Sequence, residues 1–209
     1  MTHLAKEFRN ILAFLAVNRN ETIILSSAVL LLTFASYHPV WNYWFSSFFY
    51  YAIIPVVVLL LLKKNPLDFG LGLGKIRIWG PYVIVICLLC VPILIAASYL
   101  GDFRSYYTKE NYNFLGYCLE IAVYLIGWEY IFRGFLLFGL KEKLKEASIL
   151  VQMIPFVLLH FGKPELETIS TILTGILFGY VAYRGGSFWP AFLIHLFINV
   201  FFLAIVNLN

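Results

Sequence analysis

The sequence predicts an all-α protein that crosses a membrane several times, as a bundle of about seven membrane helices plus an N-terminal helix at the membrane surface. Of its 209 residues, 62% are hydrophobic and only 12% are charged, and the mean hydropathy is +0.86. A soluble domain is closer to half apolar and a quarter charged. The apolar residues also form continuous runs, and about 20 of them in a row suffice to cross a bilayer as a helix.

Seven apolar runs account for the expected membrane helices, and the first and fifth are short. They cover residues 22–37, 41–62, 79–100, 114–140, 148–161, 167–184 and 187–207. Before them, Leu4, Phe8, Ile11, Leu12 and Leu15 fall on one helical face, opposite Lys6, Glu7 and Arg9. This pattern is typical of a helix in the membrane interface. The segment has no obvious small-residue cleavage site, so we expect no removed signal peptide, and we expect residues 1–209 to form a single integral membrane domain.

The distribution of basic residues predicts the orientation. With the N-terminus in the cytoplasm, eleven basic residues lie inside, three (Arg104, Lys109 and Lys163) lie outside, and Arg133 lies within the membrane. The positive-inside rule therefore favours a cytoplasmic N-terminus. The net charge of +4 is explained by these topology markers, so no nucleic-acid partner is expected. We expect a multi-pass protein of a prokaryotic plasma membrane, in contact with membrane lipids.

Five polar side chains lie deep inside the apolar runs, where a charge is costly and usually functional. They are Glu129, Arg133, His160, His195 and Asn199. At 1.5 Å per residue, those at 129, 160, 195 and 199 lie about 16–22 Å from the nearest cytoplasmic boundary. Three helices therefore bring polar groups to a similar depth.

Each of these residues also has a purely structural interpretation. Glu129 and Arg133, four residues apart, could neutralise each other on one helical face. A lone His160 near a helix end is more often a packing residue. His195 with Asn199 one turn later is a stronger indication of function, since two costly polar groups share a face. Taken together, the residues favour a site over independent structural roles.

Three short motifs carry these residues in order: W-E-Y-I-F-R (Trp128 to Arg133), F-V-L-L-H (Phe156 to His160) and H-L-F-I-N (His195 to Asn199). They resemble the E-E-x-x-x-R, F-x-x-x-H and H-x-x-x-N motifs of the CAAX protease and bacteriocin-processing family of intramembrane proteases. This family is also known as the CAAX prenyl protease 2 or lysostaphin-resistance-protein-A-like family. The resemblance extends over about residues 112–207, the expected catalytic core.

One position departs from the family pattern. The family's first glutamate, usually assigned as the base that activates water, corresponds to Trp128 here, whereas the second is retained as Glu129. Glu129 would then have to pair with Arg133 and also serve as the base. Glu165 and Glu167, in the segment after His160, could fold inward as substitutes, although we expect a solvated loop there.

The resemblance implies an intramembrane endopeptidase that cleaves a membrane-anchored, prenylated or bacteriocin-like peptide from a cavity facing the cytoplasm. Glu129 would be the general base, His160 and His195 would hold the water, and Arg133 would fix Glu129. His195 and Asn199 would donate hydrogen bonds to the oxyanion. The family is often called metalloprotease, so a divalent metal such as zinc, held by Glu129, His160 and His195, is possible. Metal dependence does not follow from these residues, and no other cofactor is expected.

Two further functions stay open. An inactive family member would bind peptides, or confer bacteriocin immunity by sequestration, without cutting. A proton-coupled carrier would use Glu129, His160 and His195 as a relay, although no paired half-repeats typical of carriers occur.

Overall fold

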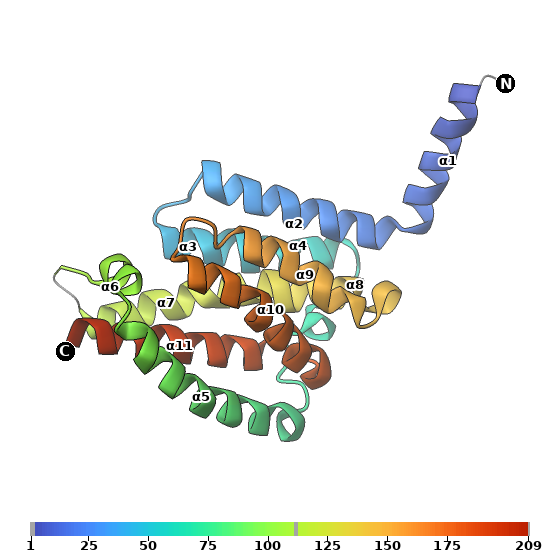
Figure 1. Cartoon of the computed structure of the whole chain (residues 1–209). Helices are drawn as coiled ribbons and strands as arrows, with labels where there is room; N and C mark the ends of the chain where they lie inside the picture. The colour runs from blue at the N-terminus through green and yellow to red at the C-terminus, as the bar shows by residue number, and fades with distance from the viewer. Residues whose placement is uncertain (1–2, 111–112, 209) are drawn as a thin grey trace.

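The computed structural model of the chain describes residues 3–110 and 113–208, and this part is a bundle of helices (Figure 1). The helices are α1 (His3–Val17), α2 (Arg19–Tyr37), α3 (Tyr43–Phe48), α4 (Ile54–Leu61), α5 (Ile76–Ser98), α6 (Gly101–Tyr107), α7 (Phe114–Glu129), α8 (Leu137–Leu144), α9 (Ala147–Leu158), α10 (Glu165–Gly185) and α11 (Trp189–Leu208). Two π-helical segments, Phe49–Ile53 and Tyr130–Leu136, join α3 to α4 and α7 to α8. A 3₁₀ turn, Pro66–Phe69, precedes α5.

The predicted multi-pass helical bundle is confirmed. Within the described residues, six helical segments are long and apolar enough to cross a membrane: Arg19–Tyr37, Tyr43–Leu61, Ile76–Ser98, Phe114–Leu144, Glu165–Gly185 and Trp189–Asn207. The predicted run at 148–161 corresponds to α9, which has 12 residues. At 1.5 Å per residue α9 is about 18 Å long, so it is too short to span the bilayer by itself. Residue 112, where we expected the catalytic core to begin, lies outside the described residues.

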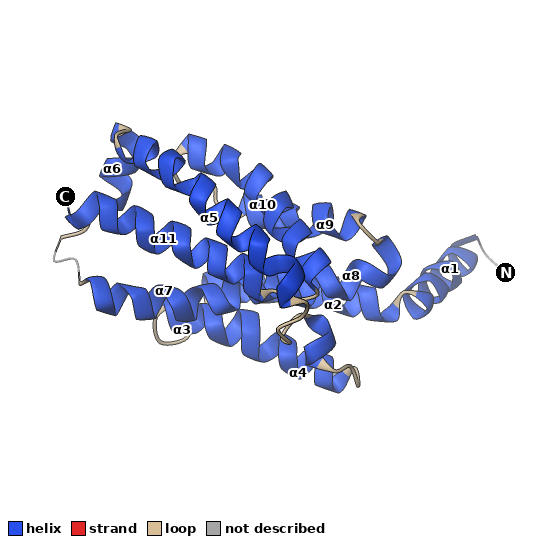
Figure 2. Cartoon of the chain, turned by 90° about the horizontal axis from the view of Figure 1, so that it is seen from below, coloured by secondary structure: helices blue, strands red, loops and turns tan. Residues whose placement is uncertain are grey.

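The continuous helical segment from Phe114 to Leu144 lies at the centre of the bundle. In its apolar window 72% of the residues are buried by protein, against 11% for α5 at the periphery. Viewed from below, α11 lies between α5 and α7 (Figure 2), and it packs against both. The central segment can therefore carry charged groups because its side chains face protein and not lipid.

The central helix approaches α3 closely at Gly127. A Cβ at this position would collide with the backbone of Ser47. The Ser47 hydroxyl also donates a hydrogen bond to the Tyr124 carbonyl at 2.9 Å. The absence of a side chain at Gly127 thus permits the helix contact immediately before the site residues Trp128 and Glu129.

A similar close contact joins α9 to α10. Gly175 and Gly179 form a G-x-x-x-G pair, and Cβ atoms at these positions would press on Met153 and Gln152. The buried Gln152 amide donates to the Gly175 carbonyl at 2.9 Å. Small residues of this kind let membrane helices approach and form hydrogen bonds. The contact fixes α9, whose C-terminal end precedes His160.

Two features of the fold were not predicted. Residues 101–107 form the short helix α6, although this segment contains no apolar run from which a helix was expected. The predicted solvated loop at Glu165 and Glu167 is wrong, since both residues lie in the first turn of α10. Acidic residues in a first turn interact favourably with the helix dipole, and this accounts for the helix starting at Glu165.

The N-terminal helix α1 projects away from the bundle (Figure 1) and contains no buried residue. The apolar side chains Leu4 and Phe8 are 79% and 62% exposed to solvent. A helix with an uncovered apolar face, connected directly to a membrane span, fits the predicted interfacial helix.

Candidate active site

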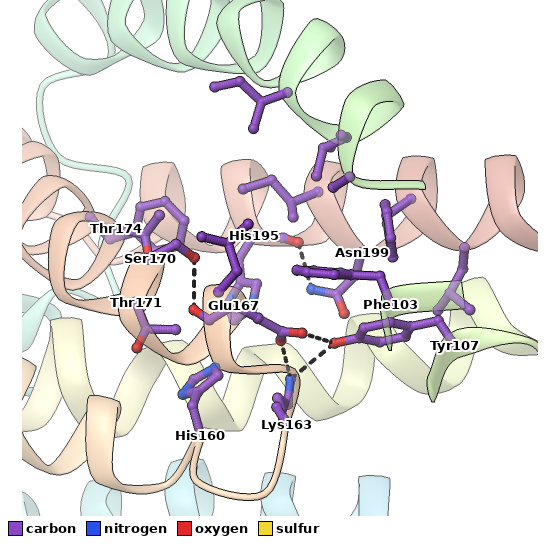
Figure 3. Close-up of a pocket in the computed structure, with 18 of the residues that line it drawn as sticks. Phe103, Tyr107, His160, Lys163, Glu167, Ser170, Thr171, Thr174, His195 and Asn199 are labelled. Carbon is purple, nitrogen blue, oxygen red and sulfur yellow. Dashed lines mark hydrogen bonds and ion pairs between the residues drawn. The ribbon is translucent and has the colours of Figure 1, made fainter. Parts of the chain in front are cut away.

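A pocket of about 180 Å³ opens between α5, α6, α10, α11 and the segment that connects α9 to α10. His160, His195 and Asn199 line it, together with Lys163 and Glu167 (Figure 3). Its remaining walls are mainly apolar and include Phe103, Phe156, Phe178 and Phe202. The structure thus brings three of the five predicted site residues to one cavity.

The other two, Glu129 and Arg133, lie behind this pocket. Both side chains are fully buried, and neither lines the cavity. Arg133 Nη1 lies 3.1 Å from Glu129 Oε2 and donates to Oε1 at 3.3 Å. The Glu129 Oε1 atom also accepts a hydrogen bond of 2.6 Å from His195 Nδ1. Glu129 therefore connects the buried arginine to a histidine of the pocket.

The helix changes its winding next to these groups. The α-helix α7 ends at Glu129, and the π-helical segment Tyr130–Leu136 follows at once and contains Arg133. Every residue from Tyr130 to Leu136 is buried. Single π-helical turns inside α-helices are frequent at functional sites, because the wider turn re-aims the side chains around it.

The Arg133 guanidinium stacks on aromatic rings in addition to its ion pair. Its Cζ atom lies 3.9 Å from the ring centroid of Phe156 and 5.3 Å from that of Phe178. Both rings also line the pocket. The guanidinium is thereby neutralised by Glu129 and solvated by π-systems, which makes a buried charge tolerable in the apolar interior.

The hydrogen bonds of the two histidines determine their tautomers. His195 Nδ1 faces the Glu129 carboxylate, and His160 Nδ1 lies 2.7 Å from the Phe156 carbonyl. Ionised carboxylates and carbonyls only accept hydrogen bonds, so Nδ1 of both rings carries the hydrogen. In each ring Nε2 is then the nitrogen available to a ligand. It is an acceptor when the ring is neutral and a donor when the ring is protonated.

Asn199 uses its amide partly for its own helix. Its Nδ2 atom donates to the His195 carbonyl one turn earlier, at 3.0 Å. A primary amide has a second N–H group, so one donor is left for a ligand in the pocket.

Trp128, which precedes Glu129 in α7, packs against the site. It is 8% exposed, and its ring contacts those of His160 and Phe156 edge-to-face, with centroids 5.8 Å and 6.4 Å apart. The buried indole N–H has no hydrogen-bond partner among the described residues. The aromatic ring of Trp128 therefore stands directly beside the imidazole of His160.

The conditional metal site, with Glu129, His160 and His195 as ligands, does not form. Within residues 3–110 and 113–208, no three His, Cys, Asp or Glu side chains are placed to hold a metal ion together. The oxygens of Glu129 face Arg133 and His195, and His195 presents its protonated Nδ1 to Glu129. This donor set does not fit the ion.

Three pocket residues were missed or placed differently by sequence reasoning. Tyr107 donates from its hydroxyl to Glu167 Oε2 at 2.6 Å, and Lys163 Nζ donates to Glu167 Oε1 at 2.8 Å. Burial, and then the negative charge of Glu167, raise the pKa of the Tyr107 phenol, which therefore stays protonated. The i,i+4 spacing of Lys163 and Glu167 was an available sign of helical pairing, whereas nothing pointed to Tyr107.

The pocket lies at the end of the bundle that carries α6, and α8 with its lysines lies at the other end (Figure 1). The positive-inside rule assigns the α8 end to the cytoplasm. A pocket facing the cytoplasm is therefore incompatible with the predicted orientation. With the N-terminus inside, the pocket faces the outer side.

Comparison with known proteins gives one match. Residues 111–201 match the family model for type II CAAX prenyl endopeptidases, described as Rce1-like. No curated protein and no solved structure matches the chain. The matched region contains all three motifs, and with them Glu129, Arg133, His160, His195 and Asn199. The protein is thus an integral membrane protein whose residues 111–201 are similar to the type II CAAX prenyl endopeptidases of the CAAX protease and bacteriocin-processing family.

Proposed function

We propose that the protein is an intramembrane endopeptidase, which hydrolyses a peptide bond of a membrane-associated, prenylated or bacteriocin-like peptide. One observation carries the proposal: His160 and, from α11, His195 and Asn199 line one pocket, and Glu129 accepts a hydrogen bond from His195 behind it. This arrangement supplies an acceptor for water and donors for an oxyanion, the two requirements of amide hydrolysis.

His160 holds the attacking water in this mechanism. Its neutral ring offers Nε2 as an acceptor, because Nδ1 is committed to the Phe156 carbonyl. The water oxygen adds to the carbonyl carbon of the peptide bond, and the C–N bond then breaks. The proton lost by the water ends on the leaving amine, so that the products are an acid and an amine.

His195 and Asn199 stabilise the oxyanion that forms on the carbonyl oxygen. A protonated His195 donates from Nε2 to the oxyanion and from Nδ1 to Glu129. The second N–H of Asn199 is the other donor. A preorganised donor of this kind contributes about 10²–10³-fold to the rate.

Glu129 changes its role relative to the sequence-based hypothesis. A carboxylate that is fully buried, does not line the pocket and contacts both Arg133 and His195 is poorly placed to receive a proton from water. We therefore assign Glu129 and Arg133 as positioning residues that orient His195.

The walls of the pocket favour an amphipathic substrate. Apolar side chains from α5 and α11, such as Leu94 and Phe202, form one part, and Lys163, Glu167 and Tyr107 form a polar rim. A peptide with an apolar or lipid-modified segment next to the scissile bond matches both parts.

The test is cleavage of a farnesylated, internally quenched peptide ending in a C-a-a-X sequence, with the protein reconstituted in liposomes. His160→Ala and His195→Ala should each lower kcat by at least about 100-fold, the usual lower value for a lost acid–base or oxyanion group. His38→Ala, at the exposed end of α2, should match wild type. Equal activity in all three variants would contradict the proposal.

A second candidate function is peptide binding without cleavage, with bacteriocin immunity by sequestration as one outcome. The contact of Trp128 with His160 favours it, since it places an apolar ring where the family has a carboxylate. This candidate predicts that wild type binds the peptide without cutting it, and that His160→Ala leaves binding intact.

A further inference from the structure

The pocket contains a carboxylate that the family motifs do not account for. Among the described residues that line it, Glu167 is the one with a carboxylate side chain. It belongs to the first turn of α10. In the sequence it follows His160, whereas Trp128 precedes His160. Figure 3 shows its polar end meeting those of Tyr107 and Lys163 within the pocket.

The backbone couples Glu167 to His160 through short connections. The Thr168 hydroxyl donates to the His160 carbonyl at 2.9 Å, and the Lys163 backbone N–H donates to the same carbonyl at 3.2 Å. Lys163 in turn holds the Glu167 carboxylate. The segment from His160 to Thr168 is therefore one closed unit that presents an imidazole and a carboxylate to the same cavity.

The carboxylate of Glu167 has acceptor capacity to spare. Each of its oxygens receives one hydrogen bond, from Tyr107 and Lys163 respectively, whereas an ionised carboxylate offers about four acceptor positions. The side chain is 18% exposed, so that a water in the pocket can reach it.

The surroundings of His160 disfavour a positive charge on its ring. A protonated His160 would place a second positive charge near Lys163 while packed against the rings of Trp128 and Phe156, and an unpaired charge in apolar surroundings is costly. A proton on Glu167 places no charge against these rings, and the Lys163 side chain, 31% exposed, remains solvated.

We propose that Glu167 is the catalytic carboxylate that takes the proton from the water held by His160, in place of the glutamate missing at position 128. The inference rests on the proposed hydrolase function. The water donates one hydrogen to His160 Nε2 and the other to Glu167. As its oxygen bonds to the peptide carbon, Glu167 receives the proton, and it returns it to the amine nitrogen when the C–N bond breaks.

The experiment measures kcat and KM of the reconstituted protein on the farnesylated, quenched C-a-a-X peptide. Glu167→Gln should lower kcat by about 100-fold or more with little change in KM, in the range expected for loss of a general base. Glu167→Asp, which retains a carboxylate, should recover part of the rate. Glu165→Gln is the matched control, since it removes the same charge from the same helical turn at an exposed position outside the pocket.

Variants of the two hydrogen-bond partners of Glu167 distinguish a catalytic role of this residue from a structural one. Tyr107→Phe and Lys163→Met each remove one hydrogen bond of the Glu167 cluster but leave the carboxylate, so they should lower kcat far less than Glu167→Gln. Equal losses in all three variants would show that the cluster acts structurally and would overturn the inference.

The outcomes also distinguish the inference from the proposed function. If His160→Ala and His195→Ala abolish cleavage while Glu167→Gln cleaves at the wild-type rate, the hydrolase stands and the role of Glu167 is refuted. If wild type itself does not cleave the peptide, both are refuted.

Discussion

The indole of Trp128 packs edge-to-face against the imidazole of His160, with ring centroids 5.8 Å apart and an interplanar angle of 78°. The residue that precedes Glu129 is therefore in direct contact with a candidate catalytic residue. A carboxylate placed at position 128 would lie next to the water that His160 is proposed to hold.

This contact predicts a rescue. In the Glu167→Gln background, Trp128→Glu should restore part of the lost kcat, because it returns a carboxylate to the vicinity of His160. Trp128→Gln in the same background is the control, with the same side-chain size and no base. Cleavage of the farnesylated peptide is the measurement, and equal rates for the two double variants would argue against a shared role of positions 128 and 167.

The buried ion pair predicts that removing one of its charges destabilises the protein strongly and that removing both charges does so much less. Glu129→Gln leaves the Arg133 guanidinium charged and uncompensated in the interior, which should cost about 3–5 kcal/mol. The double variant Glu129→Gln with Arg133→Met should recover much of that loss, since neither charge remains. Thermal unfolding in detergent micelles, followed by circular dichroism, provides the comparison. A double variant as unstable as the single one would mean that the charge is not the cause.

The close approach of α7 and α3 predicts a position-specific effect of alanine. Gly127→Ala should destabilise the protein by about 1–3 kcal/mol, the usual range for overpacking, because the new methyl group meets the Ser47 backbone. Gly101→Ala adds the same methyl group where no other atom lies within 4 Å and should have little effect. Their melting temperatures in detergent test the difference.

The orientation can be measured with single cysteines. In a background in which Cys87, Cys90 and Cys118 are replaced by serine, Arg104→Cys lies on exposed α6 and Lys143→Cys on exposed α8. With the N-terminus inside, a membrane-impermeant thiol reagent should label position 104 in intact cells, and position 143 only after permeabilisation. The reverse pattern would turn the pocket towards the cytoplasm.

The sequence was sufficient for the membrane helices and for the polar residues of α7 and α11. Long apolar runs and the cost of charge in lipid are local properties, and the ion pair of Glu129 with Arg133 follows from spacing along one helix. The motifs also indicated that His195 and Glu129 belong to one site, although only the structure shows their hydrogen bond.

Other parts depended on tertiary contacts that leave no local pattern. The short helix α6 is polar and is placed by the packing of Phe103 and Tyr107 on Phe202, 95 or more residues away in the chain. The contact that holds Glu167 in the pocket could not be predicted for the same reason, since its partner Tyr107 lies 60 residues earlier. The burial of Glu129 behind the pocket followed from the π-helical segment, which neither composition nor periodicity indicated.

The weakly buried helix α5 has a consequence for how a lipid-attached chain reaches the catalytic groups. Ile93, Leu94 and Ala97 of α5 form one wall of the pocket, while only 11% of the apolar window of this helix is buried by protein. The α5 side of the pocket is therefore the side that borders the acyl chains of the bilayer. The lipid group of a modified peptide can then remain among the acyl chains while the peptide enters the pocket laterally and reaches the histidines from within the bilayer.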